Sequence, residues 1–323
     1  MFYHNKNVLV AGGAGMTGQC LVKKLLDLGA YVRATEFKTR KIDIRHKKLE
    51  VIPCDLSVEI QAREILKDMD IVFWTAGKHG GVKTTTHGLK DMIIYYLDIS
   101  SRFMNYAVDA KVDRYAIISS SFVYPPSLRP NKEEEGFNGD PIKPTYYAQG
   151  WVHRYLETLC NFFHMTSQTK FTIIRPTAMY GLYDIFDLET AHVVPALIRK
   201  AVERMDPFEI WGTGQEIRSF IYIDDLVDGL ILATEKYAVS DPLNICNPIS
   251  NSINDVVSHL FEILDFHPQI VYNSSKPASV SYKVSDPTKA RDLLGFWSKI
   301  TLKEGLEKTV RWYVNHVKEQ SLS

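Results

Sequence analysis

A run of glycines near the amino terminus could bind phosphate groups. Gly12, Gly15 and Gly18 follow a short apolar segment, Asn7–Ala11, and open a segment with apolar residues at helical spacing, Cys20–Leu28. In such a strand, turn and helix, backbone N–H groups and the helix dipole face an anion, and the missing Cβ atoms allow a pyrophosphate to approach. A tight turn without a ligand is the alternative. The pattern predicts a dinucleotide site.

An acidic residue ends the second predicted strand, where it could select the dinucleotide. Glu36 lies about twenty residues after Gly18, and a carboxylate there accepts hydrogen bonds from the adenine-ribose hydroxyls and repels a 2′-phosphate. We therefore expect NAD rather than NADP, although Lys38 and Arg40 could pair with a phosphate. Asp55, just past the third strand, could accept from the adenine amine or cap a helix.

These residues need a sheet whose strands end at one edge, and the apolar pattern predicts one. Short apolar segments alternate with helical ones, which is typical of a doubly wound α/β fold with a parallel sheet, the Rossmann type. We expect residues 1–175 to form the dinucleotide-binding domain, with parts of 209–245 returning to it. Residues 176–323 should mainly form a smaller carboxyl-terminal lobe that lines one side of the binding cleft. The expected strands of the first part are Asn7–Ala11, Tyr31–Thr35, Leu49–Pro53, Ile71–Thr75, Tyr115–Ser119 and Phe171–Arg175.

The second part alternates less regularly. We expect a helix over Ala191–Glu203, a strand over Phe208–Trp211, a helix over Asp224–Lys236 and a strand over Leu243–Cys246.

Composition excludes several classes of protein. The 323 residues carry 38 basic and 38 acidic side chains, so no broad positive field is available for nucleic acid. No apolar run approaches the ~18 residues that span a bilayer, and the first residues do not resemble an export signal, so we expect a cytoplasmic protein without membrane contact. The cysteines are far apart and form no CxxC pair, which argues against a disulfide framework or a metal cluster; they are Cys20, Cys54, Cys160 and Cys246.

Several blocks, in order along nearly the whole chain, resemble the GDP-fucose synthases of the extended short-chain dehydrogenase/reductases, the NAD-dependent epimerase/dehydratase family. The resemblance implies a bound nicotinamide cofactor, NAD by the argument above, and a nucleotide-sugar substrate, GDP-linked by preference, that is epimerised and reduced at C4. The blocks are Gly12–Gly18, Thr75–Gly81, Ser119–Pro125, Ala191–Leu197, Trp211–Gly214, Arg218, Asp224, Asp225, Lys289–Gly295, Gly305 and Trp312.

The same resemblance implies a set of cofactor-binding residues. They are Gly12, Gly15, Met16, Thr17, Gly18, Glu36, Asp55, Leu56, Ala76, Gly77, Lys78, His153 and Pro176.

The catalytic set of the family is incomplete in this chain. Ser120 matches the catalytic Ser or Thr, but gapless spacing places Gln149 at the position of the catalytic Tyr and His153 at that of the Lys four residues later. Gln149 can orient a sugar hydroxyl but has no proton to exchange near neutral pH. His153 can contact the nicotinamide ribose and can titrate. On a helix the two side chains share a face, so we expect both to point at the cofactor.

Shifting the alignment does not restore the pair, so the proton carrier must be sought elsewhere. If Tyr147 is aligned with the catalytic tyrosine, Trp151 stands at the position of the lysine. If Tyr146 is aligned there instead, Gly150 stands at that position. His192 matches the histidine acid of the family, with a histidine packed on a helix face as the alternative. Tyr147 is a second candidate, with aromatic packing at the helix start as the alternative.

The substrate block suits a nucleoside-diphosphate sugar. Trp211 can stack on a nucleobase, and Arg218 can bind a diphosphate. The alternative is that Trp211 is a core residue and Arg218 a surface residue. Lys200 and Arg199 could add charge or be solvated, and Ala178 stands where the family has Asn. The implied substrate residues are Ser120, Phe122, Ala178, His192, Val193, Lys200, Trp211 and Arg218.

Three functions follow as hypotheses. The first is an NAD-dependent oxidoreductase acting on C4 of a GDP-linked hexose or heptose in surface-polysaccharide synthesis. The second is an epimerase without net redox change, and the third is a non-catalytic NAD or nucleotide-sugar binding protein. The family also implies a homodimer, paired through helices near 89–110 and 147–163, whose apolar stripes could equally pack on the sheet.

Overall fold

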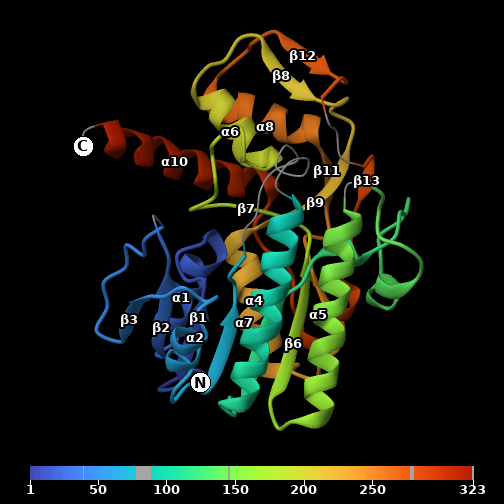
Figure 1. The fold of residues 1–323 in the computed structure, drawn as a ribbon. Helices are drawn as coiled ribbons and strands as arrows, with labels where there is room; N and C mark the ends of the chain where they lie inside the picture. The colour runs from blue at the N-terminus through green and yellow to red at the C-terminus, as the bar shows by residue number, and fades with distance from the viewer. Residues whose placement is uncertain (39, 78–88, 145, 277–279, 322–323) are drawn as a thin grey trace.

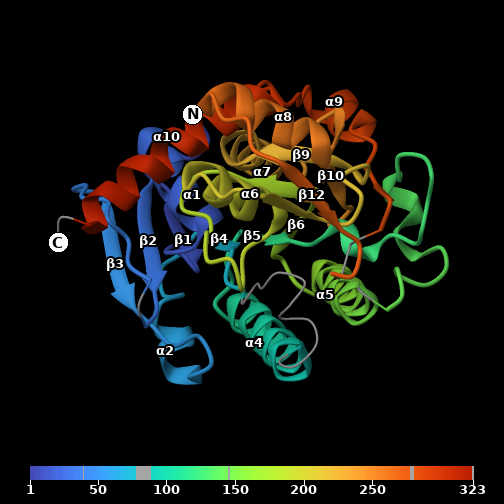
Figure 2. The same ribbon diagram turned by 90° about the horizontal axis from the view of Figure 1, so that it is seen from above.

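The large sheet has the strand order expected of a dinucleotide-binding domain. A computed structural model (Figure 1) describes residues 1–38, 40–77, 89–144, 146–276 and 280–321. In it, seven parallel strands lie in the order β10-β6-β5-β4-β1-β2-β3 (Figure 2). The order reverses between β1 and β4, and ligands of open α/β sheets bind at the carboxyl ends of strands at such a point. The strands are β1 Asn7–Ala11, β2 Tyr31–Glu36, β3 Leu49–Pro53, β4 Ile71–Trp74, β5 Arg114–Ile118, β6 Lys170–Pro176 and β10 Leu243–Ile245.

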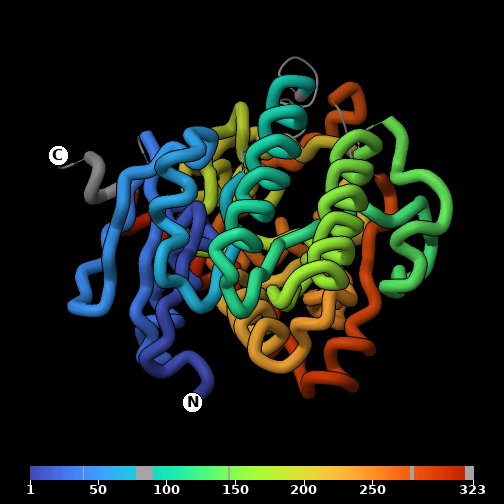
Figure 3. Tube along the Cα trace, turned by 60° about the horizontal axis from the view of Figure 1, so that its bottom comes forward, coloured from blue at the N-terminus to red at the C-terminus, as the bar shows by residue number. Residues whose placement is uncertain are grey.

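Helices cover both faces of this sheet, which explains why its central strands β1 and β4 are largely apolar and buried. One face carries α1 (Met16–Asp27) and α7 (Ile223–Lys236), and the other carries α2 (Glu59–Glu64), α4 (Leu89–Asp109) and α5 (Tyr147–Thr166) (Figure 2). Two separate apolar clusters fill the spaces between sheet and helices. Helices α4 and α5 run side by side (Figure 3). The predicted doubly wound α/β class is therefore confirmed.

A smaller lobe lies beyond the carboxyl ends of the strands. Its parallel pair, β8 (Phe208–Trp211) and β12 (Ile270–Asn273), packs with helices α6, α8 and α10 (Figure 1). A second sheet joins it to the first part, because β9 leads directly into α7. The remaining elements are α6 Val193–Val202, α8 Ile253–Leu264, α9 Thr288–Leu294, α10 Leu302–Ser321, β7 Ala178–Tyr180, β9 Ile217–Tyr222, β11 Ser250–Ser252, β13 Tyr282–Lys283, and the 3-10 helices η1 Ser121–Val123 and η2 Glu133–Phe137.

The expected elements occur with ends that differ by a few residues. The helix expected over Ala191–Glu203 begins at Val193, because His192 has extended backbone angles and is its amino-terminal cap. The long helix α5 continues to Thr166. Two segments of the carboxyl-terminal half, α7 and β10, lie on the large sheet.

The described part of the chain contains no helix that is both long enough and apolar enough to cross a bilayer. Its cysteines carry free thiols, and Cys54, Cys160 and Cys246 are buried.

Candidate functional site

Two glycines of the amino-terminal loop are required by close packing. Gly12 has φ +92°, and a Cβ there would lie 2.5 Å from the backbone nitrogen of Ala76. Its own N–H donates to the Thr35 hydroxyl at 2.8 Å. A Cβ on Gly18 would meet the backbone of Gly12 and Gly13, so this glycine lets α1 lie directly on the loop.

The third glycine borders open space, which is where a phosphate would lie. A Cβ on Gly15 would meet the carbonyl of Gly12 only at 3.5 Å, which is ordinary contact. Gly15 also caps α1 without a side-chain hydrogen bond, so the first N–H groups of the helix, starting at Met16 and Thr17, can bind an anion. The loop therefore fits the pyrophosphate of a dinucleotide.

Glu36 ends β2 at this edge, but its partner is a residue that the sequence analysis did not consider. Lys41 donates to its carboxylate at 2.7 Å and the N–H of Ile42 at 3.2 Å. These contacts, the Lys41 hydrogen bond foremost, hold the pKa of Glu36 below its usual range, so the carboxylate stays charged. Lys38 instead lies over the Phe37 ring.

Asp55 forms a local turn. Its carboxylate accepts from the backbone N–H of Ser57 at 3.0 Å and from the Ser57 hydroxyl at 2.6 Å. The cap of α2 is Val58, so the helix-cap alternative for Asp55 was wrong. The other expected cofactor residues lie along the same edge: Leu56 and Ala76 are partly buried, Gly77 is exposed after β4, Pro176 is buried at the end of β6, and Lys78 lies outside the described residues.

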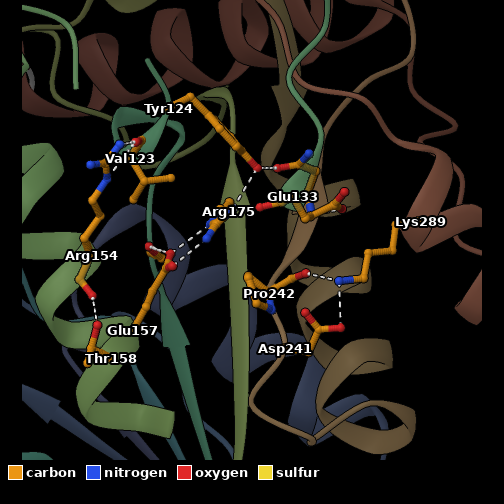
Figure 4. Close-up of polar contacts among 12 residues, drawn as sticks. Val123, Tyr124, Glu133, Arg154, Glu157, Thr158, Arg175, Asp241, Pro242 and Lys289 are labelled. Atoms are coloured by element: carbon orange, nitrogen blue, oxygen red, sulfur yellow. Dashed lines mark hydrogen bonds and ion pairs between the residues drawn. The ribbon is translucent and has the colours of Figure 1, made fainter. Parts of the chain in front are cut away.

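Ser120 follows β5, and its hydroxyl accepts the N–H of Phe122 at 3.1 Å, which begins η1. A buried ion pair and buried hydrogen bonds anchor the neighbouring chain (Figure 4). Arg175 donates two hydrogen bonds to Glu157, at 2.9 and 2.6 Å, and Arg154 donates two to the carbonyl of Val123. Paired guanidinium hydrogen bonds fix geometry well, so the loop that carries Ser120 and Phe122 is rigid.

Tyr124 belongs to this anchoring network. Its buried hydroxyl donates to Asn244 at 2.6 Å and accepts from Arg175 at 3.1 Å (Figure 4). Burial raises the pKa of the phenol, so Tyr124 is a structural residue.

Phe122 meets side chains from two other segments of the chain, and this group forms the centre of the candidate site. The Tyr146 ring stacks on it at 4.3 Å, and the Lys283 ammonium of β13 lies 3.7 Å from its centroid and 4.5 Å from that of Tyr146. Arg218 of β9 and His192 lie close enough to interact with Lys283 electrostatically. The sequence analysis assigned no role to Lys283.

The charges in this group are shifted by burial. Desolvation lowers the pKa of Lys283 well below its usual range, and nearby Arg218 lowers it further. Desolvation also lowers the pKa of Arg218, which is 7% exposed and therefore not the surface arginine of the alternative reading. His192 is exposed at the amino-terminal cap of α6, and desolvation by the neighbouring protein, with Lys283, lowers its pKa. The imidazole is therefore mainly neutral at pH 7 and can accept a proton.

The candidate residues at the start of α5 lie in different surroundings. Gln149 is partly buried, and its amide oxygen has no hydrogen-bond partner within the described chain, so it can bind a ligand. His153 is buried with its ring 5.7 Å from Tyr96 of α4. Tyr147 is exposed, with its ring near Trp151 and under the Lys143 ammonium, in agreement with the packing alternative.

The expected substrate residues of the small lobe form a second group. Trp211 is partly buried, so it is not a core tryptophan, and its indole N–H donates to the Glu209 carboxylate at 3.0 Å. Lys200 donates to the carbonyl of Glu209 at 2.7 Å, whereas Arg199 pairs with Glu203. Of the remaining two, Ala178 is partly buried on β7 beside β9, and Val193 is exposed at the start of α6.

Comparisons with known proteins agree with this geometry. The family model described as the NAD dependent epimerase/dehydratase family matches residues 8–247. A putative GDP-L-fucose synthase 2 of Arabidopsis thaliana is 26% identical over 98% of this chain and 94% of its own length. A GDP-L-fucose synthase of Sinorhizobium fredii is 27% identical over 97% and 96%.

A solved structure is similar over the same extent. MoeE5 in complex with UDP-glucuronic acid and NAD superposes with a TM-score of 0.82 and 26% identity, over 96% of this chain and 99% of the other. The family match spans the glycine loop, the β5 edge with Ser120 and the β9 strand with Arg218, whereas Lys283 lies outside the matched residues. The chain belongs to the NAD dependent epimerase/dehydratase family.

Proposed function

We propose that the protein is an NAD-dependent oxidoreductase that moves a hydride to or from a sugar carbon of a nucleoside-diphosphate sugar. The observation that carries the proposal is the contact of Lys283 with Phe122, two residues after Ser120. This contact places cationic side chains of the small lobe at the carboxyl ends of the strands of the large sheet. The glycine loop that would bind the dinucleotide lies at the same edge. We take the carbon to be C4 and the sugar to be a GDP-linked hexose or heptose used in surface-polysaccharide synthesis, because the relatives named above are GDP-L-fucose synthases.

The dinucleotide would lie on the glycine loop. Bound there, NAD would supply a nicotinamide that accepts or donates the hydride. The open side of Gly15 and the α1 terminus would hold the pyrophosphate, and Glu36 would accept from the adenine ribose. Lys41 would have to share or release the Glu36 carboxylate. NADP is less favoured because its 2′-phosphate would meet that carboxylate.

The diphosphate of the substrate would lie between Arg218 and Lys283. Burial and the charge of Arg218 lower the pKa of Lys283, and burial lowers that of Arg218. A bound anion would relieve their repulsion and favour the charged form of Lys283. Trp211 would stack on the nucleobase, and Lys200 would add positive charge.

Tyr146 is our candidate for the proton carrier that the family tyrosine supplies elsewhere. Its ring lies on Phe122, beside Lys283, whereas Tyr147 points to solvent. Its phenol can give a proton to a sugar oxygen or take one. Ser120 and Gln149 would hydrogen-bond the sugar.

An epimerase without net redox change is the second candidate. His192 favours it, because this neutral imidazole interacts with Lys283, which also lies over Tyr146, and would provide a second group that exchanges protons.

The test is rapid mixing of the protein and NAD or NADH with a panel of GDP-linked sugars. We expect slow gain or loss of the reduced-nicotinamide absorbance with at least one sugar. Solvent deuterium in the product without net absorbance change would identify the epimerase. Binding of nucleotide and sugar without either signal, while a GDP-L-fucose synthase control reacts, would contradict both and indicate a non-catalytic binding protein.

A further inference from the structure

Glu209 shares one face of β8 with Trp211. Along this strand Phe208 and Ile210 are buried, and Glu209 and Trp211 are partly exposed. Because side chains alternate between the faces of a strand, the carboxylate and the indole lie side by side on the outer face.

Three neighbours fix the carboxylate of Glu209. The Trp211 indole N–H donates to Oε2 at 3.0 Å, and the amide of Asn273 on β12 donates to Oε1 at 2.7 Å. The Lys200 ammonium lies 3.8 Å from Oε2. The hydrogen bond from Asn273 is the largest influence that holds the pKa of Glu209 below its usual range, so the group is charged at neutral pH.

This carboxylate still has capacity for a ligand. Its side chain is 37% exposed. A carboxylate offers about four acceptor positions, and one hydrogen bond to each oxygen leaves a position free on each. Two parallel acceptors held by a rigid frame match a ligand edge that carries two adjacent N–H donors.

We propose that Glu209 selects the nucleobase of the substrate by accepting two hydrogen bonds from the N1–H and N2–H edge of a guanine stacked on Trp211. The proposal rests on the function proposed above, which places a nucleoside diphosphate along Trp211 and Arg218. Uracil and thymine present one N–H between two carbonyl oxygens, and those oxygens would face the carboxylate. Hypoxanthine keeps N1–H but lacks the N2 amine, so it would form half of the contact.

Calorimetric titration with GDP, IDP and UDP tests this selection. Saturating NAD+ is present throughout, so that the dinucleotide site is filled and only the substrate site is measured. The native protein should bind GDP about 10-fold or more tightly than IDP or UDP, which is the discrimination of a good paired hydrogen bond. Glu209→Gln should weaken GDP binding by about 10-fold or more and leave UDP binding unchanged, because the amide replaces one acceptor with a donor.

A matched control is Glu203→Gln, which alters an exposed carboxylate paired with Arg199 in the same lobe. It should change no affinity, and thermal unfolding should show both variants folded. Equal binding of GDP and UDP to the native protein, or full GDP preference in Glu209→Gln, overturns the role of Glu209 and leaves the proposed function standing. Failure of all three nucleotides to bind overturns the proposed function itself.

Discussion

At the scale of single residues, the two tyrosines that begin α5 have opposite surroundings. Tyr146 stacks on Phe122 within reach of Lys283, and Tyr147 lies in solvent near Trp151. If Tyr146 carries the proton, Tyr146→Phe should lower kcat about 100-fold or more with little change in KM. Tyr147→Phe is the matched control and should be close to native. Steady-state kinetics of the two variants on the same sugar test this role. If both variants lose kcat equally, or both retain it, Tyr146 is not the proton carrier.

Individual site residues were also the feature that the sequence predicted least well. Phe122, His192 and Arg218 were found because each lies in a block that resembles the family, and the structure brings them together. Lys283 was missed because it is far from Phe122 in the sequence and is brought to it by the pairing of β13 with β9. Helical or strand periodicity carries no information about such contacts.

At the scale of elements, the turn between β1 and α1 depends on a glycine with no substitute. Gly12→Ala would place a methyl group against the backbone of Ala76 in a conformation of positive φ. We expect loss of NAD binding and destabilisation clearly above the roughly 1–2 kcal/mol of a left-handed alanine. Gly139→Ala is the control, because Gly139 also has positive φ but no atom within 4 Å of its added Cβ. Chemical unfolding and NAD titration should separate the two, and equal effects would contradict a packing role for Gly12.

The connection between β7 and α6 contains a buried carboxylate that makes the free energy of unfolding depend on pH. Burial raises the pKa of Asp184 to about 7, and its Oδ2 has no hydrogen-bond partner among the described residues. Because the folded-state pKa is the higher one, the native protein holds an extra proton between about pH 4 and 7, and stability falls as pH rises through that range. The slope should reach at most about 1.4 kcal/mol per pH unit. The substitution Asp184→Asn should reduce this slope of unfolding free energy against pH, measured by urea unfolding at pH 5, 6, 7 and 8. A slope that the substitution leaves unchanged would exclude Asp184 as its source.

Element positions were predictable, and their ends were less so. The central strands such as β1 and β4 follow from apolar runs buried on both faces, a pattern that the sequence displays directly, whereas the edge strand β3 is only partly buried. Helix ends depend on capping contacts, as at His192, and the partner of Glu36 proved to be Lys41, which local spacing could not distinguish from Lys38 or Arg40.

At the scale of the whole molecule, α4 and α5 run side by side (Figure 3), and both carry exposed apolar side chains. They include Ile94 and Tyr95 on α4 and Trp151, Tyr155 and Phe162 on α5. Exposed apolar groups clustered on two adjacent helices are typical of a subunit interface. We therefore predict a homodimer whose two copies pair these helices as a four-helix interface.

Sedimentation velocity tests this interface. Tyr155→Glu combined with Phe162→Glu should convert the dimer to a folded monomer. Leu293→Glu, which changes an exposed leucine on α9, should leave the dimer intact. A native monomer, or a dimer that survives the double substitution, would contradict the assignment.

The proposed function depends most on the dinucleotide and the sugar meeting at the edge between Ser120 and Lys283. The direct measurement is a crystal structure of the protein with NAD and a GDP-linked hexose bound together. The account predicts the nicotinamide C4 within about 3.5 Å of a sugar carbon, the distance of a reactive pair, with the diphosphate on Arg218 and Lys283. A sugar bound elsewhere, or a nicotinamide ring turned away from every sugar carbon, would contradict it.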